Sequence, residues 1–206
     1  MQPMNSDNKS NMRKCIVLRR DSIPTEIRNE KNAAIQTRLM AMPQFVIAKS
    51  VLLYASYGSE VDTRQLIAHC LSTGITTALP RVSDKDDRLH LYQILSLEDL
   101  APGYKGIPEP YAFPNRELFI EDIDLVIAPG VAFDESCNRL GHGKAFYDKL
   151  LSSTKRLKGT VTPGIKPFLA ALAYEEQVVP SLYCGPYDIK MDTVITDKRT
   201  IYRHGP

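Results

Sequence analysis

The chain has 206 residues, of which 43% are hydrophobic and 24% are charged, and its formal net charge is +2. These values are ordinary for a globular protein and predict one domain with a substantial core. The balanced charge argues against a surface for nucleic acid or an acidic membrane. No apolar run approaches the ~20 residues of a membrane-spanning helix, so we expect no membrane partner.

Residues 1–8 are expected to form a flexible tail, and residues 9–206 a single domain. The polar start of the chain lacks the apolar region of a signal peptide, which favours a cytoplasmic location and leaves a mitochondrial one open. The four cysteines lack C-x-x-C spacing, so we expect free thiols. Cys137 is interpreted as an incidental loop cysteine, with a reactive thiol as the alternative. The basic residues of the segment 13–20 have, by charge pattern alone, the appearance of a solvated helix face.

The hydrophobic pattern predicts helices alternating with strands along the chain. In the first half we expect a helix over residues 13–20, a helix from Pro24 to Pro43, a strand over 51–55, a helix over 61–72 and a strand over 76–79 closed by Pro80. In the second half we expect a half-exposed strand over 89–94, a long loop over 99–114, a strand over 123–128, a helix over 145–153 and strands over 168–174 and 193–196. This alternation predicts an α/β fold, a single-domain three-layer α/β/α architecture with a mainly parallel Rossmann-like sheet.

Ligands of such sheets bind outside the carboxyl ends of the strands. The segment 139–148, Arg-Leu-Gly-His-Gly-Lys-Ala-Phe-Tyr-Asp, follows a buried strand and its Pro129-Gly130 turn. Glycines allow close backbone approach, a helix N-terminus presents unpaired N–H groups, and Arg139 and Lys144 supply positive charge. The spacing fits neither a Walker P-loop nor a G-x-G-x-x-G motif. The residues themselves therefore predict a polyphosphate site.

The same region resembles the signature of the 5-formyltetrahydrofolate cyclo-ligase family. The resemblance is carried by Pro129-Gly130-x-x-Phe133-Asp134 and by Arg139-Leu-Gly-x-Gly-Lys-x-Phe-Tyr-Asp148. Shorter matches follow the family's order at residues 9–13, 56–63, 79–81, 106–110 and 188–192. The resemblance implies an ATP- and Mg²⁺-dependent enzyme that converts 5-formyltetrahydrofolate into 5,10-methenyltetrahydrofolate, ADP and phosphate. The formyl oxygen would be phosphorylated, and the folate N10 would then close the ring.

Carried over residue by residue, the resemblance gives Lys144 and Arg139 catalytic roles. It implies that ATP is bound by Lys9, Arg13, Arg139, Leu140, Gly141, His142, Gly143, Lys144, Ala145, Phe146 and Tyr147. Lys9 and Arg13 stand one helical turn apart, so both can reach one ligand. The family places Mg²⁺ between carboxylates at Asp148 and Asp188, in keeping with the preference of this ion for a few carboxylates plus phosphate oxygens. Taken singly, Asp148 could be a helix cap and Asp188 an Asx turn.

For the folate, the resemblance and the nearby residue types indicate Tyr57, Glu60, Asp62, Tyr104, Glu109, His142, Lys144 and Phe146. A carboxylate can accept hydrogen bonds from the pterin, and an aromatic ring can stack on it. Three alternatives stay open: Asp62 as a helix cap, Tyr57 as a packing residue and the loop before Glu109 as a connector. His142 alone would more often be a solvated side chain.

Ala145 stands where the family usually has glycine. We expect Ala145 to begin a helix and therefore to be harmless, so that Ala145→Gly leaves ATP affinity within about threefold. Two other functions remain as alternatives: a folate-binding or storage protein without turnover, and an α/β sugar-phosphate isomerase that uses neither ATP nor metal. We expect a monomer whose partners are 5-formyltetrahydrofolate and ATP.

Overall fold

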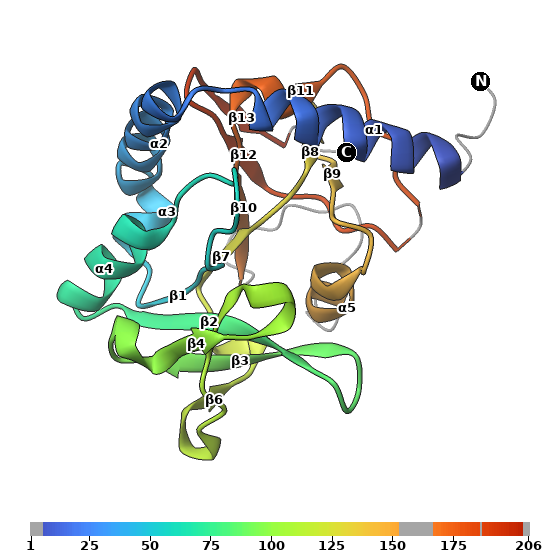
Figure 1. Cartoon of the computed structure of the whole chain (residues 1–206). Coiled ribbons are helices and arrows are strands. Elements are labelled where there is room, and N and C mark those ends of the chain that lie inside the picture. The colour runs from blue at the N-terminus through green and yellow to red at the C-terminus, as the bar shows by residue number, and fades with distance from the viewer. Residues whose placement is uncertain (1–5, 153–166, 186, 204–206) are drawn as a thin grey trace.

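The computed structural model describes residues 6–152, 167–185 and 187–203. Its centre is an eight-stranded sheet, seen in Figure 1. From one edge to the other the strands are β13 (Thr200–Tyr202), β12 (Thr193–Ile195), β10 (Phe168–Leu172), β7 (Leu125–Ala128), β1 (Ser50–Leu52), β2 (Thr76–Ser83), β3 (Arg88–Ile94) and β6 (Glu117–Leu118). The five strands from β12 to β2 run parallel, and β13, β3 and β6 pair antiparallel to their neighbours. The predicted α/β fold with a mainly parallel sheet is confirmed.

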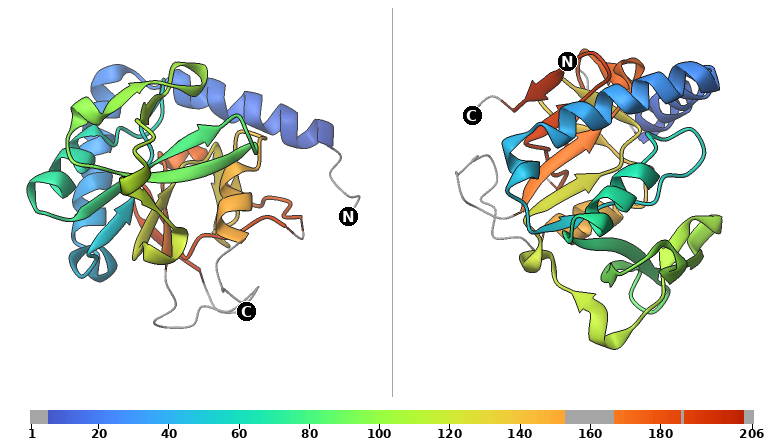
Figure 2. Two further views of the ribbon diagram at one scale, coloured as in Figure 1. Left: turned by 90° about the horizontal axis from the view of Figure 1, so that it is seen from below. Right: turned by 90° about the vertical axis from the view of Figure 1, so that its left-hand side faces the viewer.

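The two faces of the sheet bury alternate residues of its strands, as the period of a strand requires. In β7, Leu125 and Ile127 face one hydrophobic cluster, whereas Val126 and Ala128 face the other. Helices α2 (Thr25–Met40), α3 (Pro43–Val46) and α4 (Arg64–Ser72) cover the first face. Helix α5 (Phe146–Ser152) packs on the second face through the buried Leu151. Figures 1 and 2 show these helices on opposite sides of the sheet.

Helix α1 (Ser6–Asp21) packs away from the main sheet. Its partner is a small sheet of β11 (Val178–Val179), β8 (Ala132–Asp134) and β9 (Arg139–Leu140). Ile16 of α1 is buried against Val131 and Leu140. Because β8 and β9 lead directly from β7 into the segment before α5, this packing holds α1 over the predicted phosphate site (Figure 1).

Several predicted boundaries differ from the structure. Helix α1 begins at Ser6, so residues 6–8, expected to be a flexible tail, are helical. Strand β2 does not end at Pro80 but continues to Ser83, with Pro80 opposite Leu91 of β3. On its other side the neighbouring strand β1 already ends at Leu52, so the missing N–H of Pro80 deprives no strand partner of a hydrogen bond.

The predicted long loop over residues 99–114 contains a hairpin of β4 (Leu100–Pro102) and β5 (Pro108–Pro110). Short 3-10 turns make up much of the remaining connections: η1 (Leu97–Asp99), η2 (Tyr104–Gly106), η3 (Pro114–Arg116), η4 (Ile120–Asp122) and η5 (Glu175–Gln177). None of the described helices is long and apolar enough to cross a membrane.

Candidate active site

The predicted phosphate site, residues 139–147, forms a loop between β9 and α5 that we call the phosphate loop. Gly143 has a φ of +99°, and the loop folds beneath the N-terminal half of α1. The Nε of Arg13 donates a 2.8 Å hydrogen bond to the carbonyl of Gly141. A Cβ on Gly143 would lie 3.6 Å from the Arg13 guanidinium carbon. The structure therefore brings the predicted ATP-binding residue Arg13 onto the phosphate loop.

Ala145 lies outside the helix that follows it. Its φ is +53°, in the left-handed region, and α5 begins one residue later. The expectation that Ala145 is helical is therefore wrong, and the residue carries the conformational strain that glycine would avoid. Lys144, its neighbour, is exposed and makes no ion pair with any described residue, which leaves its ammonium group available for an anion.

Arg139 is buried beneath the loop. Its Nη2 lies 2.8 Å from Asp148 Oδ1, its Nη1 donates to the carbonyl of Pro129 at 3.2 Å, and its guanidinium lies over the ring of Tyr147. The Nε of Arg139 and the hydroxyl of Tyr147 are buried without a partner among the described residues. Burial raises the pKa of Tyr147, which keeps the phenol neutral. These contacts tie the start of the phosphate loop to its end.

The two predicted metal ligands come together from separate segments. Asp148 Oδ1 accepts a hydrogen bond from the backbone N–H of Ile189 at 3.3 Å, which places Asp148 next to Asp188 in space. Asp188 Oδ2 lies 2.9 Å from Lys9 Nζ and 2.8 Å from the Gly185 nitrogen. Burial alone would raise the pKa of Asp188, but the Gly185 N–H and Lys9 outweigh it and hold this pKa below its ordinary value.

Each of these carboxylates retains one oxygen, Oδ2 of Asp148 and Oδ1 of Asp188, that makes no hydrogen bond to a described residue. No group of three or more His, Cys, Asp or Glu side chains within the described ranges could hold a metal ion. A metal at Asp148 and Asp188 would thus complete its shell with ligand oxygens and water, an arrangement that suits Mg²⁺.

A second loop, residues 57–62, follows β1 and meets the phosphate loop. We call it the acidic loop because it carries Glu60 and Asp62. Glu60 Oε2 accepts a 3.1 Å hydrogen bond from the backbone N–H of Tyr57, and its Oε1 lies 3.0 Å from His142 Nε2. His142 is thus engaged by a carboxylate rather than only solvated. This contact joins the predicted nucleotide-binding and folate-binding residues across 82 positions of sequence.

Asp62 takes the capping position that its sequence left open. Its Oδ1 accepts a hydrogen bond from the Arg64 backbone nitrogen at 2.9 Å, at the start of α4, and both oxygens contact the Arg64 side chain. The hydrogen bonds from Arg64 hold the pKa of Asp62 below its usual range against the opposing effect of burial. Its predicted contact with the substrate remains a prediction.

The aromatic residues expected at the folate site are partly gathered. The rings of Tyr104 and Phe146 meet edge to face with centroids 6.0 Å apart, and Tyr57 is 53% exposed. Glu109 is only 5% exposed and accepts a hydrogen bond from the Val82 backbone nitrogen at 3.2 Å. Glu109 therefore anchors β5 against β2, and its predicted binding role remains a prediction.

Sequence reasoning missed the residues that support the acidic loop. Arg20, assigned by charge pattern to a solvated helix face, is buried and donates to Ser59. Its burial could have been anticipated from its spacing of four residues from Ile16, which places both on one helix face. Cys137 is buried at a turn with φ +57°, and burial raises the pKa of its thiol to about 12. This supports its interpretation as an incidental loop cysteine.

Comparisons with known proteins agree with this arrangement. Residues 5–197 match the model of the 5-formyltetrahydrofolate cyclo-ligase family. The 5-formyltetrahydrofolate cyclo-ligase of Mus musculus is 27% identical, with 84% of this chain and 86% of the relative covered. The mitochondrial enzyme of that name from Arabidopsis thaliana is 31% identical, with 82% of this chain and 67% of the relative covered.

Solved structures give the same answer. The NMR structure of Aquifex aeolicus 5,10-methenyltetrahydrofolate synthetase superposes with a TM-score of 0.81 and 30% identity, covering 96% of this chain and 94% of that one. A synthetase from Mycoplasma pneumoniae, 21% identical with a TM-score of 0.71, covers 92% of this chain and 99% of its own and shares the fold. The chain therefore belongs to the 5-formyltetrahydrofolate cyclo-ligase family of enzymes.

Proposed function

We propose that this protein catalyses the ATP- and Mg²⁺-dependent closure of 5-formyltetrahydrofolate to 5,10-methenyltetrahydrofolate, with release of ADP and phosphate. In this reaction the formyl oxygen attacks the γ-phosphate, N10 adds to the activated carbon, and phosphate leaves. Such chemistry asks the protein for placement, charge neutralisation and exclusion of water rather than for a covalent intermediate. We further propose a cytoplasmic monomer.

The observation that carries this proposal is the contact between His142 and Glu60. The formyl oxygen and the γ-phosphate must be held within about 3–3.5 Å of each other before they react. A nucleotide on the phosphate loop and a pterin on the acidic loop would meet where these two loops touch, at the 3.0 Å contact of His142 Nε2 with Glu60 Oε1.

On the nucleotide side, α1 and the phosphate loop supply the positive charge. Arg13 already contacts the loop backbone, and the exposed ammonium group of Lys144 is free to approach the transferring phosphoryl group. Lys144 would neutralise charge that develops on the phosphoryl oxygens, which is the largest contribution a protein makes to such a step. Arg139, paired with Asp148 and buried, would act mainly by keeping the loop in shape.

The metal would be held by Asp148 and Asp188, through the one oxygen of each that faces no described donor. When bound, Mg²⁺ supplies charge neutralisation on the phosphate oxygens and fixes their orientation. Lys9, which neutralises Asp188 in the structure, lies at the same point and would face the phosphates as well.

On the folate side, Glu60 would accept hydrogen bonds from the pterin, while Tyr57, Tyr104 and Phe146 would provide aromatic surface. Glu60 is suited to this because the Tyr57 backbone N–H and His142 fix both of its oxygens in direction. Asp62 and Glu109, each already hydrogen-bonded within the protein, would contribute mainly by shaping the loops around the ring.

The test is the growth of the methenyltetrahydrofolate absorbance band from 5-formyltetrahydrofolate and Mg²⁺, with and without ATP. We expect ATP-dependent growth in the wild type and a loss of about 10²-fold in Lys144→Ala. Lys49→Ala is the matched control, because Lys49 is exposed at the amino end of β1, at the opposite edge of the sheet. Saturable folate binding without turnover would instead indicate a storage protein, and neither binding nor turnover would refute the substrate.

A further inference from the structure

Glu60 lies between two anchor points on the acidic loop, both made by helices. The first is Ser59, which is almost fully buried. The Nε of Arg20, near the end of α1, donates a 2.8 Å hydrogen bond to Ser59 Oγ, and Ser59 Oγ in turn donates to the carboxylate of Asp21. Arg20 is itself 5% exposed, and a buried cation is costly unless its hydrogen bonds are kept. This contact therefore fixes the loop one residue before Glu60.

The second anchor is Asn32 on α2, which holds the loop two residues after Glu60. Asn32 Oδ1 accepts a hydrogen bond from the Asp62 backbone nitrogen at 3.2 Å and another from the Tyr174 hydroxyl at 2.9 Å. The same hydroxyl lies 3.4 Å from the carbonyl of Glu60. Tyr174 is fully buried, and burial raises its pKa to about 12, so it remains a neutral donor.

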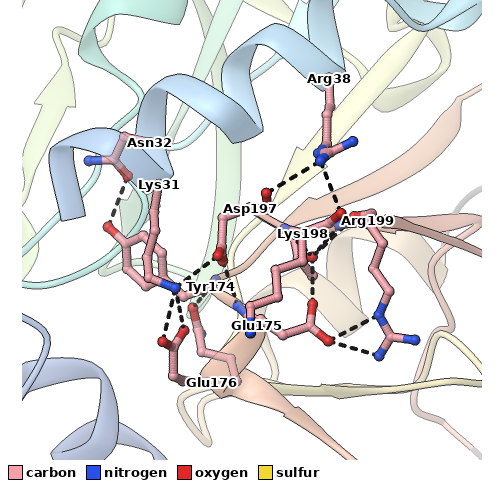
Figure 3. Close-up of polar contacts among 11 residues, drawn as sticks. Lys31, Asn32, Arg38, Tyr174, Glu175, Glu176, Asp197, Lys198 and Arg199 are labelled. Carbon is pink, nitrogen blue, oxygen red and sulfur yellow. Dashed lines mark hydrogen bonds and ion pairs between the residues drawn. The ribbon is translucent and has the colours of Figure 1, made fainter. Parts of the chain in front are cut away.

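Asn32 can act as an anchor because α2 is itself fixed beside it (Figure 3). Lys31 Nζ lies 2.8 Å from Asp197 Oδ2 and 2.9 Å from Glu176 Oε1. Farther along α2, Arg38 donates to the carbonyl of Lys198 at 2.9 Å. These contacts tie α2 to the turn between β12 and β13 and to η5, which directly follows Tyr174. Asn32 and Tyr174 therefore keep a constant relative position.

We propose that Arg20 and Asn32 are positioning residues that set the Glu60 carboxylate for the folate. Neither contacts the reacting atoms; Arg20 acts through Ser59, and Asn32 acts through Asp62 and Tyr174. Without these anchors the acidic loop would sample several backbone conformations, and each binding event would have to fix Glu60 again. This inference rests on the proposed function, since it assigns the supported carboxylate to the folate.

The proposal predicts a division between the two substrates. The anchors touch the acidic loop and make no contact with the phosphate loop. Ser59→Ala and Asn32→Ala should therefore raise the KM for 5-formyltetrahydrofolate by about tenfold, because misplacing a binding group by a fraction of an ångström is costly. The KM for ATP should stay within about twofold of the wild type. A purely structural role would instead lower thermal stability and weaken both substrates together.

The experiment compares the two variants with Asn32→Asp and Ser22→Ala. Asn32→Asp keeps an acceptor oxygen toward both donors and should restore folate KM. Ser22→Ala is the matched control, because Ser22 Oγ bonds only its own helix end, the carbonyl of Arg19. Direct binding of 5-formyltetrahydrofolate, measured calorimetrically without ATP, should weaken in parallel with KM in both alanine variants.

Two results would overturn the inference. One is a folate affinity in Ser59→Ala and Asn32→Ala equal to that of the wild type, and the other is an equal loss for folate and ATP. If the wild-type protein shows no turnover, the proposed function fails instead, and the calorimetric comparison still decides whether the anchors position a folate-binding carboxylate.

Discussion

Lys9 at the start of α1 and Asp188, 179 residues later, form an ion pair with Nζ 2.9 Å from Oδ2. Both side chains are about three-quarters buried, at 25% and 28% exposed. The pair closes the site on the side of α1 and brings a predicted phosphate ligand to a predicted metal ligand. In the proposed reaction the same two groups would face the anion and the cation of one ATP–metal complex.

Asp188→Asn should therefore weaken the use of magnesium. We expect the Mg²⁺ concentration for half-maximal rate at saturating ATP to rise at least about tenfold, because a neutral amide is a poorer ligand than a carboxylate. The check is a titration of magnesium against initial rate. Asp87→Asn is the control, since Asp87 is an exposed carboxylate paired with Lys149. An unchanged magnesium dependence would remove Asp188 from the proposed metal site.

Ala145→Gly should stabilise the protein. Alanine at a φ of +53° has a conformation that costs an L-residue roughly 1–2 kcal/mol, and glycine avoids that cost while losing some chain entropy on folding. We expect the free energy of unfolding, measured in urea, to rise by about 1 kcal/mol. Ala145→Val should lower it, because a β-branched residue is worse there. Equal stability of all three proteins would show that the site stores no such strain.

The earlier expectation of a nearly unchanged ATP affinity in Ala145→Gly rested on a helical Ala145. With the residue outside the helix, glycine would also relax the loop next to Lys144. An ATP affinity equal to or tighter than that of the wild type is now expected.

The parts of the fold that could be predicted are those whose cause is local. The run Leu125–Ala128 is buried on both faces of the sheet, so its apolar composition alone identifies a central strand. The phosphate loop is likewise visible as glycines and cations between a strand and a helix. Lys9 and Arg13 could be paired because they lie one turn apart on one helix.

The parts that could not be predicted depend on contacts between distant residues. Nothing near Pro80 indicates that its neighbour β1 has already ended, and this is what lets β2 continue. The burial of Arg20 depends on Ser59, 39 residues away, and the anchor at Asn32 depends on Tyr174, 142 residues away. A charge pattern read along one helix does not contain such pairings.

His90 should make stability depend on pH. Its ring nitrogens lie 2.7 Å from Glu117 Oε1 and 3.1 Å from Asp86 Oδ2, and these two hydrogen bonds, Glu117 first, raise its pKa. A raised folded-state pKa contributes stability that is fully present below the unfolded value of about 6.5 and is lost as pH rises through the folded value. The melting temperature should therefore fall over that window.

In His90→Gln this fall should be reduced. The pairs are partly exposed, so the difference should be well under about 1 kcal/mol and should shrink further in 1 M salt. His69→Gln is the control, because His69 has no acidic partner among the described residues. A wild-type slope that persists unchanged in His90→Gln would assign the pH dependence to other groups.

The contact between His142 and Glu60 can be measured by a double-mutant cycle. If it couples the two loops, His142→Ala and Glu60→Gln should each raise the KM for 5-formyltetrahydrofolate, and the double variant should be less impaired than the product of the single effects. A coupling of about 0.5–1 kcal/mol is expected, because the imidazole is half exposed. Since Lys144 would act on the transferring group, Lys144→Ala should lower kcat instead, and its effect should be independent of the cycle. Strictly multiplicative effects of His142→Ala and Glu60→Gln would mean that the two loops position their ligands separately, and the proposed meeting of formyl oxygen and γ-phosphate at this contact would then have to be abandoned.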